Sequence, residues 1–492
     1  MGGAELLQLR LTIDALPDNV LLEILELDLG KEDGDRFDHD HDYSRWQMLV
    51  QVCRRWRYIV FASPRRLDLA IKLRTSTKSK ALDIWPSLPI VIRVFAIQSK
   101  EQVTNVIAAF RERSRVRKIY YNDADDCDIQ DSLWKVIAAI DEPFPALTGL
   151  VLVSSSQNVP VFPDSFLGGS APRLRSLYLD GIPYPSIGKL LSSTTNLVRL
   201  SLWGIPHSGY ISPETIVPLL SMLPVLKLLV LGFQYDQSRA RRASRHSPLL
   251  TRVVFPNINI TYLHFRGEIE YTEDILSQIE TPILSRGYFC FFNQLVFDTP
   301  RLGHFIRRTE IFMTIHTARV NFNSWDVEVI LLGQDEMDNH DAEPLELHIS
   351  CKPLDWQLSA VAQVLNSLLS SLLTLESLEI AVHRDDWQGE IEVTQWLEFF
   401  HPLISVKEMT LVCEDSVRLL APALQELNRE RPMEVLPTLQ ALFIPMCVWQ
   451  SSGPLKEAIE QFIAIRQLYG HPVTVTLDYR DTESEDTEGE ED

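Results

Sequence analysis

Residues 11–29 read LTIDALPDNVLLEILELDL, and residues 46–71 read WQMLVQVCRRWRYIVFASPRRLDLAI. Pro17 suits the first turn of a helix, because its missing N–H would have no partner there in any case. Apolar residues then recur every three or four positions in both segments, which predicts two short amphipathic helices. Two helices this short cannot bury all of their apolar surface against each other. Leftover apolar surface of this kind indicates a docking site.

Several residues of this region follow one another in a recognisable order: Leu16-Pro17, Ile24-Leu25, Leu49-Val50-x-Val52-Cys53-Arg54-x-Trp56 and Pro64-x-x-Leu67. This order resembles the F-box motif, a small helical hairpin that docks onto the Skp adaptor of SCF-type cullin–RING ubiquitin ligases. The link at residues 30–45 (GKEDGDRFDHDHDYSR) is longer and more acidic than the usual link between F-box helices. The resemblance implies an F-box at residues 11–71 with an acidic insert at 30–45. An ordinary helical hairpin that caps the next domain is the alternative.

The resemblance also implies which residues contact the adaptor: Leu16, Pro17, Val20, Ile24, Leu25, Leu49, Val52, Cys53 and Trp56. Some of these side chains must instead hold the hairpin together. The sequence does not divide the two roles.

The composition excludes several classes of protein. The chain has 492 residues, 45% of them apolar, and a net charge of −21, which disfavours nucleic acid as a partner. Its six cysteines form no CxxC pair, which is typical of an intracellular, reducing compartment, either cytoplasmic or nuclear. We expect no secretory signal and no membrane span, because no apolar run is long enough. The acidic residues 478–492 predict a disordered tail.

A six-residue pattern, apolar-x-x-apolar-x-apolar, recurs through the rest of the chain. It begins at Val116, Leu147, Leu174, Leu197, Leu226, Ile260, Leu375, Val406 and Leu439, with weaker candidates at residues 283–291, 319–322 and 345–349. Helical periodicity fills the intervals, so a strand and a helix alternate about every thirty residues. This alternation resembles a leucine-rich repeat, in which stacked units form a solenoid with a parallel sheet on its concave face.

The repeat is degenerate. Leucine-rich repeats usually place Asn or Cys at the ninth position of each unit, and only Cys447 matches here among the eight clearest units. An F-box joined to a degenerate array resembles the large expanded F-box families of fungi. The predicted fold class is therefore α/β, with an F-box hairpin followed by an irregular leucine-rich-repeat solenoid at residues 85–477. A plain α/β domain with a Leu-rich parallel sheet is the alternative.

The inner surface of such a solenoid offers a second candidate site. Side chains alternate along a strand, so the variable positions of each unit point to the concave side. The predicted target-binding residues at these positions are Arg175, Tyr178, Arg199, Trp203, Lys227, Tyr262, His264 and Arg266. Aromatic and Arg residues dominate binding energy at interfaces. This basic stripe predicts an acidic or phosphorylated target segment, and ordinary exposed polar residues are the alternative.

The remaining motifs do not indicate an enzyme. No G-x-S-x-G or H-E-x-x-H sequence occurs. The residues His39, Asp40, His41 and Asp42 could hold a metal ion, but a flexible polar link is the better explanation. We therefore expect a non-enzymatic substrate receptor of a ubiquitin ligase that needs no cofactor. The alternatives are a repeat scaffold that joins no ligase, or an enzyme with a site in the solenoid cleft.

Overall fold

The computed structural model describes residues 13, 16–29, 45–74, 87–95, 99–123, 132–156, 159, 161–234, 258–292, 297, 299–309, 312, 315–333, 345–350, 354–368, 371–383, 392–430, 434–450 and 453–478. The chain forms two compact units, Met1–Ile182 and Pro183–Asp492. Most of the predicted acidic insert and all of the predicted tail after Asp478 lie outside the described residues, as do His39 to Asp42. The predicted domain boundaries stay predictions.

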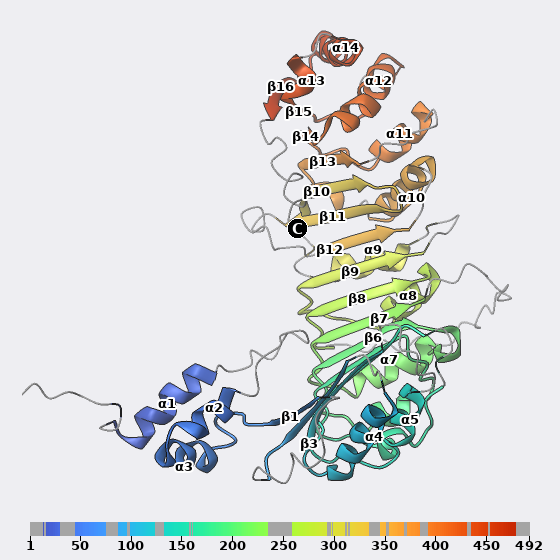
Figure 1. The fold of residues 1–492 in the computed structure, drawn as a ribbon. Helices are drawn as coiled ribbons and strands as arrows, with labels where there is room; N and C mark the ends of the chain where they lie inside the picture. The colour runs from blue at the N-terminus through green and yellow to red at the C-terminus, as the bar shows by residue number, and fades with distance from the viewer. Residues whose placement is uncertain are drawn as a thin grey trace, which may run out of the picture. The chain divides into compact units, whose positions relative to one another are not determined.

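The first unit begins with three helices, α1 Asp18–Leu29, α2 Arg45–Val52 and α3 Arg54–Ala62 (Figure 1). The prediction of a single second helix is wrong, because Cys53 interrupts it with an extended backbone (φ −156°). The Sγ atom of Cys53 accepts a hydrogen bond from the Trp56 N–H at 3.4 Å, so this residue caps the start of α3. The segment is therefore a three-helix module.

The three helices are tied to one another and to the chain that follows. The Arg55 guanidinium donates to Asp18 Oδ1 at 2.8 Å, and it also donates to the carbonyl oxygen of Leu16. Trp46 is buried, and its indole N–H donates to the carbonyl oxygen of Ala70 at 2.9 Å. A buried aromatic ring with a satisfied N–H is a strong packing anchor.

The rest of the first unit is a parallel sheet with helices between its strands. The strands, in both spatial and chain order, are β1 Ile71–Arg74, β2 Ile90–Phe95, β3 Val116–Asp123, β4 Gly149–Ser154 and β5 Ser176–Asp180. The helices are α4 Lys100–Ala109 and α5 Ser132–Ala138. In β4 the apolar positions of the predicted pattern, Leu150 and Leu152, are buried, whereas Val151 and Val153 are half-buried. Strands β1 and β2 precede the first predicted repeat.

The second unit continues the alternation of strands and helices. Its strands are β6 Arg199–Ile205, β7 Leu228–Phe233, β8 Tyr262–Gly267, β9 Arg286–Phe291, β10 Ile315–Phe322, β11 Val327–Gly333, β12 Leu345–Ile349, β13 Ser377–Val382, β14 Glu408–Leu411, β15 Ala441–Pro445 and β16 Thr474–Asp478. Its helices are α6 Ile187–Leu191, α7 Pro213–Ser221, α8 Ile269–Leu276, α9 Pro300–Arg308, α10 Leu354–Ser367, α11 Val393–Phe400, α12 Glu414–Glu430, α13 Met446–Gln450 and α14 Pro454–Leu468. The predicted α/β class is confirmed, and the leucine-rich-repeat identity stays a prediction.

One part of this sheet departs from the predicted parallel order. The strands follow one another in space as β6-β7-β8-β9-β12-β11-β10-β13-β14-β15-β16. Strand β11 pairs antiparallel with both β10 and β12, so the prediction of a parallel sheet throughout is wrong here. The reason is the tight turn after β10, where the Asn323 N–H donates to the Asp326 carbonyl at 2.9 Å. Such a short link can join only antiparallel strands, because a parallel pair needs a long crossover.

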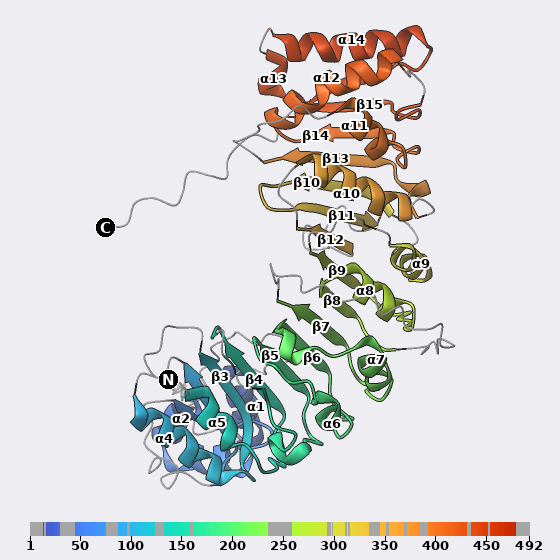
Figure 2. The same ribbon diagram turned by 90° about the vertical axis from the view of Figure 1, so that its right-hand side faces the viewer.

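The two faces of this sheet differ. Helices α7, α8, α10, α11 and α12 lie on one side of it (Figure 2). Leu263 and Phe265 of β8 are buried, whereas Tyr262, His264 and Arg266 alternate with them and are half-buried. We call the face that carries Tyr262, His264 and Arg266 the open face.

A buried arginine joins the last helices to the chain before β15. Arg466 of α14 is fully buried, and its guanidinium donates to the carbonyl oxygens of Val435, Leu436 and Leu439 at 3.3, 3.1 and 3.4 Å. Backbone carbonyls thus surround this cation. Among the described residues, no helix combines the length and the apolar character needed to cross a membrane.

Candidate functional site

Four rings form a continuous row across the open face. Trp203 of β6 contacts His264 of β8 edge to face, with ring centroids 4.8 Å apart. His264 stacks on Tyr288 of β9 at 4.1 Å, and Tyr288 stacks on His348 of β12 at 4.8 Å. Each ring comes from a different strand, so the strand pairing of the sheet sets the order of the row. We call these four residues the ring row.

A glycine allows the ring row to cross β7. A Cβ atom at Gly232 of β7 would lie 2.6 Å from Cε3 of Trp203, closer than such atoms approach. The absence of a side chain at this position leaves room for the indole to lie over β7 and reach His264. Arg266, opposite Gly232 in the pairing of β7 with β8, places its guanidinium 5.6 Å from the Trp203 ring centroid. This is a cation–π contact.

His264 is a neutral member of the ring row. Burial, together with the positive charges of Arg266 and His348, lowers the pKa of His264 to about 4. Its Nδ1 lies 3.4 Å from the hydroxyl oxygen of Tyr262. The imidazole is therefore uncharged at neutral pH, and Arg266 supplies the positive charge at this end of the row.

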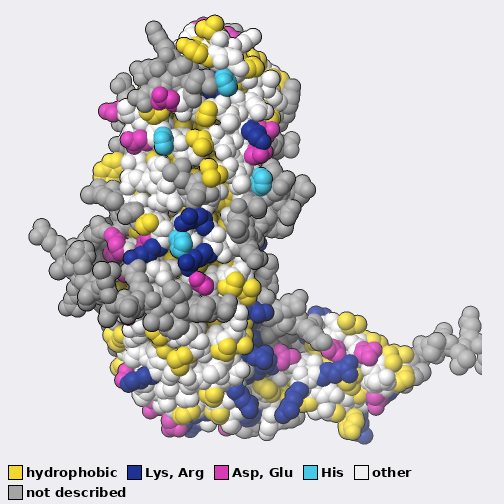
Figure 3. Space-filling model, turned by 180° about the vertical axis from the view of Figure 1, so that it is seen from behind, with side chains coloured by type: hydrophobic (Ala, Val, Ile, Leu, Met, Phe, Trp, Pro, Cys, Tyr) yellow, Lys and Arg dark blue, Asp and Glu magenta, His cyan; other side chains and the backbone are white. Residues whose placement is uncertain are grey.

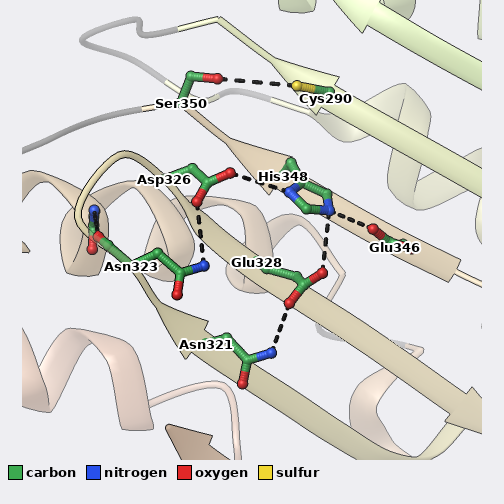
Figure 4. A network of polar contacts seen from close by, with 9 residues as sticks. Cys290, Asn321, Asn323, Asp326, Glu328, Glu346, His348 and Ser350 are labelled. Carbon is green, nitrogen blue, oxygen red and sulfur yellow. Dashed lines mark hydrogen bonds and ion pairs between the residues drawn. The ribbon is translucent and has the colours of Figure 1, made fainter. Parts of the chain in front are cut away.

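The other end of the row is a histidine surrounded by carboxylates (Figure 4). His348 Nδ1 lies 3.3 Å from Asp326 Oδ2, and its Nε2 lies 3.3 Å from Glu328 Oε1. Glu346 Oε1 also contacts Nε2 at hydrogen-bond distance. We call Asp326, Glu328, Glu346 and His348 the histidine–carboxylate cluster.

Amide side chains hold two of these carboxylates in place. Asn321 of β10 donates from Nδ2 to Glu328 Oε2 at 2.6 Å, and Asn323 donates from Nδ2 to Asp326 Oδ1 at 3.3 Å. Figure 4 shows both amides on the side of the carboxylates away from His348. Each carboxylate therefore keeps one oxygen toward the imidazole.

Both the imidazole and the carboxyl groups of the cluster are charged. Burial alone lowers the pKa of His348, but the hydrogen bonds to Asp326, Glu328 and Glu346 outweigh it and raise the pKa to about 11. The hydrogen bond to His348 in turn lowers the pKa of the Asp326 and Glu328 carboxyls. Three carboxylates thus surround one imidazolium, which leaves the cluster with more negative than positive charge.

The structure brings together half of the predicted target-binding residues. Trp203, Tyr262, His264 and Arg266 lie side by side on the open face. Arg199 lies on the same strand as Trp203 and is half-buried, and Lys227 is exposed just before β7. Arg175 and Tyr178 belong to the first unit, where the Tyr178 hydroxyl donates to Asp180 Oδ2 at 3.3 Å.

Sequence reasoning missed the other half of the site. Tyr288 and the histidine–carboxylate cluster lie on β9, β11 and β12 and in the turn before β11, where the repeat pattern is weak. A signal was present in residues 345–349, LELHI, because polar residues that alternate with apolar ones on a strand share one face. Within the predicted basic stripe His264 is neutral, and the stripe borders an acidic cluster at the far end of the row.

The three-helix module carries the other candidate surface. Leu25 is buried among the helices and is not available to a partner, whereas Pro17, Ile24 and Val52 are exposed. The other predicted adaptor contacts, which are Leu16, Val20, Leu49, Cys53 and Trp56, are half-buried. Three further apolar side chains are exposed without having been predicted: Leu27, Met48 and Tyr58. Figure 3 shows hydrophobic side chains exposed among charged ones on this module, at its lower right.

No protein-family model matches the chain, and no curated protein is similar to it. Its function is therefore inferred from the two surfaces described above.

Proposed function

We propose that this protein is the substrate-recognition subunit of an SCF-type ubiquitin ligase. Helices α1–α3 bind the Skp adaptor, and the open face binds a target protein. The proposal rests on the resemblance of residues 16–67 to the F-box motif and on one observation, which is that helix α1 has two apolar faces.

The first face of α1 points into the module and the second does not. Leu21 and Leu25 are buried, whereas Val20, Ile24 and Leu27 follow at the spacing of a single, different helix face. The Leu27 residue is 83% exposed. An apolar helix face left open to solvent is typical of a protein–protein interaction site.

Helix α2 repeats this division. Trp46 and Val50 are buried, whereas Met48 and Val52, one turn apart, are exposed. Fully burying an exposed large apolar side chain contributes about 1.5–3 kcal/mol. Ile24, Leu27, Met48 and Val52 are already partly buried, so together they offer at most roughly 6–12 kcal/mol before association costs. Those costs are about 4–15 kcal/mol, so additional contacts in the adaptor interface must supply the remaining affinity.

The open face would hold the target. Trp203 and Arg266 are of the residue types that dominate interface energetics, and they lie in contact with each other. An acidic or phosphorylated group of the target would be held near Arg266 and repelled by the carboxylates around His348. Holding a target beside a ligase-bound ubiquitin-conjugating enzyme accelerates transfer through proximity, without any catalytic group in this chain.

A binding experiment with purified Skp adaptor tests the proposal. The double variant Leu27→Asp/Val52→Asp places charges on both exposed helix faces, and we expect it to weaken adaptor binding at least 100-fold. Leu468→Asp is the matched control, because Leu468 is 82% exposed on α14, and it should leave binding unchanged. Equal affinity of the double variant and the control would contradict the proposal.

The same experiment separates the alternative function. A repeat scaffold that joins no ligase would bind no adaptor in its wild-type form. It would still capture a target in a manner that depends on Trp203.

A further inference from the structure

Three metal-ligating side chains converge on the open face. Glu328, Glu346 and His348 each offer one donor atom, and these atoms all lie within 4.8 Å of one another. Glu328 stands directly opposite His348 in the pairing of β11 with β12, and Glu346 precedes His348 by two residues on β12. The pleat of two adjacent strands therefore presents all three side chains on one face.

The orientation of the imidazole suits metal binding. His348 Nδ1 lies 3.3 Å from Asp326 Oδ2, which leaves Nε2 directed at Glu328 and Glu346. Histidine ligands in metal sites generally donate their other ring N–H to a carboxylate in this manner, which fixes the ring and its tautomer. Asn321 likewise occupies Oε2 of Glu328 and leaves Oε1 beside Nε2.

We infer that Glu328, Glu346 and His348 bind a divalent transition-metal ion, with Asp326 and Asn321 as supporting residues. Two carboxylate oxygens and one imidazole nitrogen form a ligand set that Zn²⁺ or Mn²⁺ accepts, whereas Mg²⁺ and Ca²⁺ prefer oxygen alone. A metal with bonds of about 2.0–2.2 Å would sit between the three donor atoms after small side-chain rotations. The proton on Nε2 leaves to solvent when the metal takes its place.

The ion would also change the charge of the open face. The cluster has three carboxylates against a single imidazole, so a divalent cation compensates negative charge that the protein itself leaves uncompensated. With three protein ligands, a tetrahedral ion keeps one position for water or for an oxygen of a bound molecule. This inference is independent of whether α1–α3 bind the adaptor.

Calorimetric titration of the full chain with Zn²⁺, after treatment with a chelator, tests the site. We expect Glu328→Gln and Glu346→Gln to weaken binding at least tenfold, and Asp326→Asn to weaken it less. Glu379→Gln is the matched control, because Glu379 of β13 is exposed to a similar extent as Glu328, with 18% and 20% of the side chain accessible, but pairs with Arg319. It should bind Zn²⁺ as the wild type does.

Residues outside the described part of the chain also contain metal-ligating types, notably His39 and His41. The titration is therefore repeated in a His39→Gln/His41→Gln background. This background should still bind Zn²⁺, and adding Glu328→Gln to it should weaken that binding. Thermal unfolding provides a second readout, in which Zn²⁺ raises the melting temperature of the wild type and Glu379→Gln but not of Glu346→Gln. If Glu346→Gln does not fold, the milder variant Asp326→Asn takes its place in both measurements and should weaken Zn²⁺ binding. Zn²⁺ binding that is absent, or that none of the cluster variants weakens, would overturn the inference.

Discussion

His348 of β12 lies directly opposite Glu328 of β11, and its Nε2 is 3.3 Å from Glu328 Oε1. Because β11 runs antiparallel to β12, the turn before β11 also brings Asp326 to the other nitrogen of the same ring. One imidazole thus joins carboxylates from two strands and from the turn between β10 and β11.

Replacing His348 by Ala should destabilise the protein, because three carboxylates would then face one another without a cation. Removing one partner of a buried charge network costs about 3–5 kcal/mol, and the partial exposure of these groups reduces the expected loss to roughly 2–3 kcal/mol. Urea unfolding at pH 7 in the presence of a chelator measures the change. His383→Ala, at an exposed position, should leave the unfolding midpoint in place. Equal midpoints for the two variants would refute the charge-balancing role.

Gly232→Ala should disturb the ring row, because the new Cβ would lie 2.6 Å from Cε3 of Trp203. We expect a loss of about 1–3 kcal/mol in the free energy of unfolding, as for other overpacked sites. A double-mutant cycle with Trp203→Ala tests the cause, since Gly232→Ala should become nearly neutral once the indole is absent. An equal loss in both backgrounds would mean that Gly232 is needed for its own backbone instead.

Acidification should weaken the protein through His264. The groups that face it are Tyr262 and Arg266 of its own strand, Tyr288 of β9 and His348 of β12. The folded-state pKa of about 4 lies below the unfolded value of about 6.5, so the unfolded state binds more protons between these pH values. The contribution of His264 to the free energy of unfolding is therefore fully present above about pH 6.5. It falls by up to about 3 kcal/mol as the pH drops toward 4.

The variant His264→Gln removes this titration and isolates its contribution. The unfolding free energies of wild type and variant are compared from pH 7 to pH 4.5. On acidification the wild type should lose more stability than the variant. A difference that stays constant over this range would contradict the assignment.

Arg466→Met should cost about 2–3 kcal/mol, because it leaves the carbonyl oxygens of Val435, Leu436 and Leu439 without their buried donor. Denaturant unfolding again measures the change. Arg418→Met is the control, since Arg418 is exposed and pairs with Glu414 on the surface of α12, and its loss should be below about 0.5 kcal/mol. Arg466→Lys should recover only part of the stability, because an ammonium cannot reach the same set of carbonyls.

The apolar repeat pattern located the strands because burial on one face imposes it. The patterns that begin at Val116, Leu226 and Leu439 coincide with β3, β7 and β15. Strand order could not be predicted in the same way, since alternation along a strand says nothing about which strand lies beside it. The reversed order of β10, β11 and β12 was therefore not predicted. The break at Cys53 was not predicted either, because a single capping contact there divides one apolar run into two helices.

Half of the open-face site was predictable for a related reason. Trp203, His264 and Arg266 occupy the variable positions of regular repeats, where residue type alone indicates an interaction surface. Asp326, Glu328 and His348 meet because β11 pairs antiparallel with β12, where the repeat pattern predicts parallel strands, so their proximity depends on the topology. On the three-helix module, the burial of Leu25 and the exposure of Leu27 depend on which helix face packs inward, and both faces are apolar.

The reversed strands also affect how the protein is made. As the chain leaves the ribosome, most strands of the second unit can join the sheet as soon as they emerge, because each strand pairs with the one just completed. Strand β9 pairs with β8 in this way, but its other edge stays unpaired until β12 is translated after β10 and β11, and one edge of β10 likewise waits for β13. A nascent chain therefore passes through an interval with unpaired strand edges, which is when we expect chaperone engagement and misfolding to concentrate.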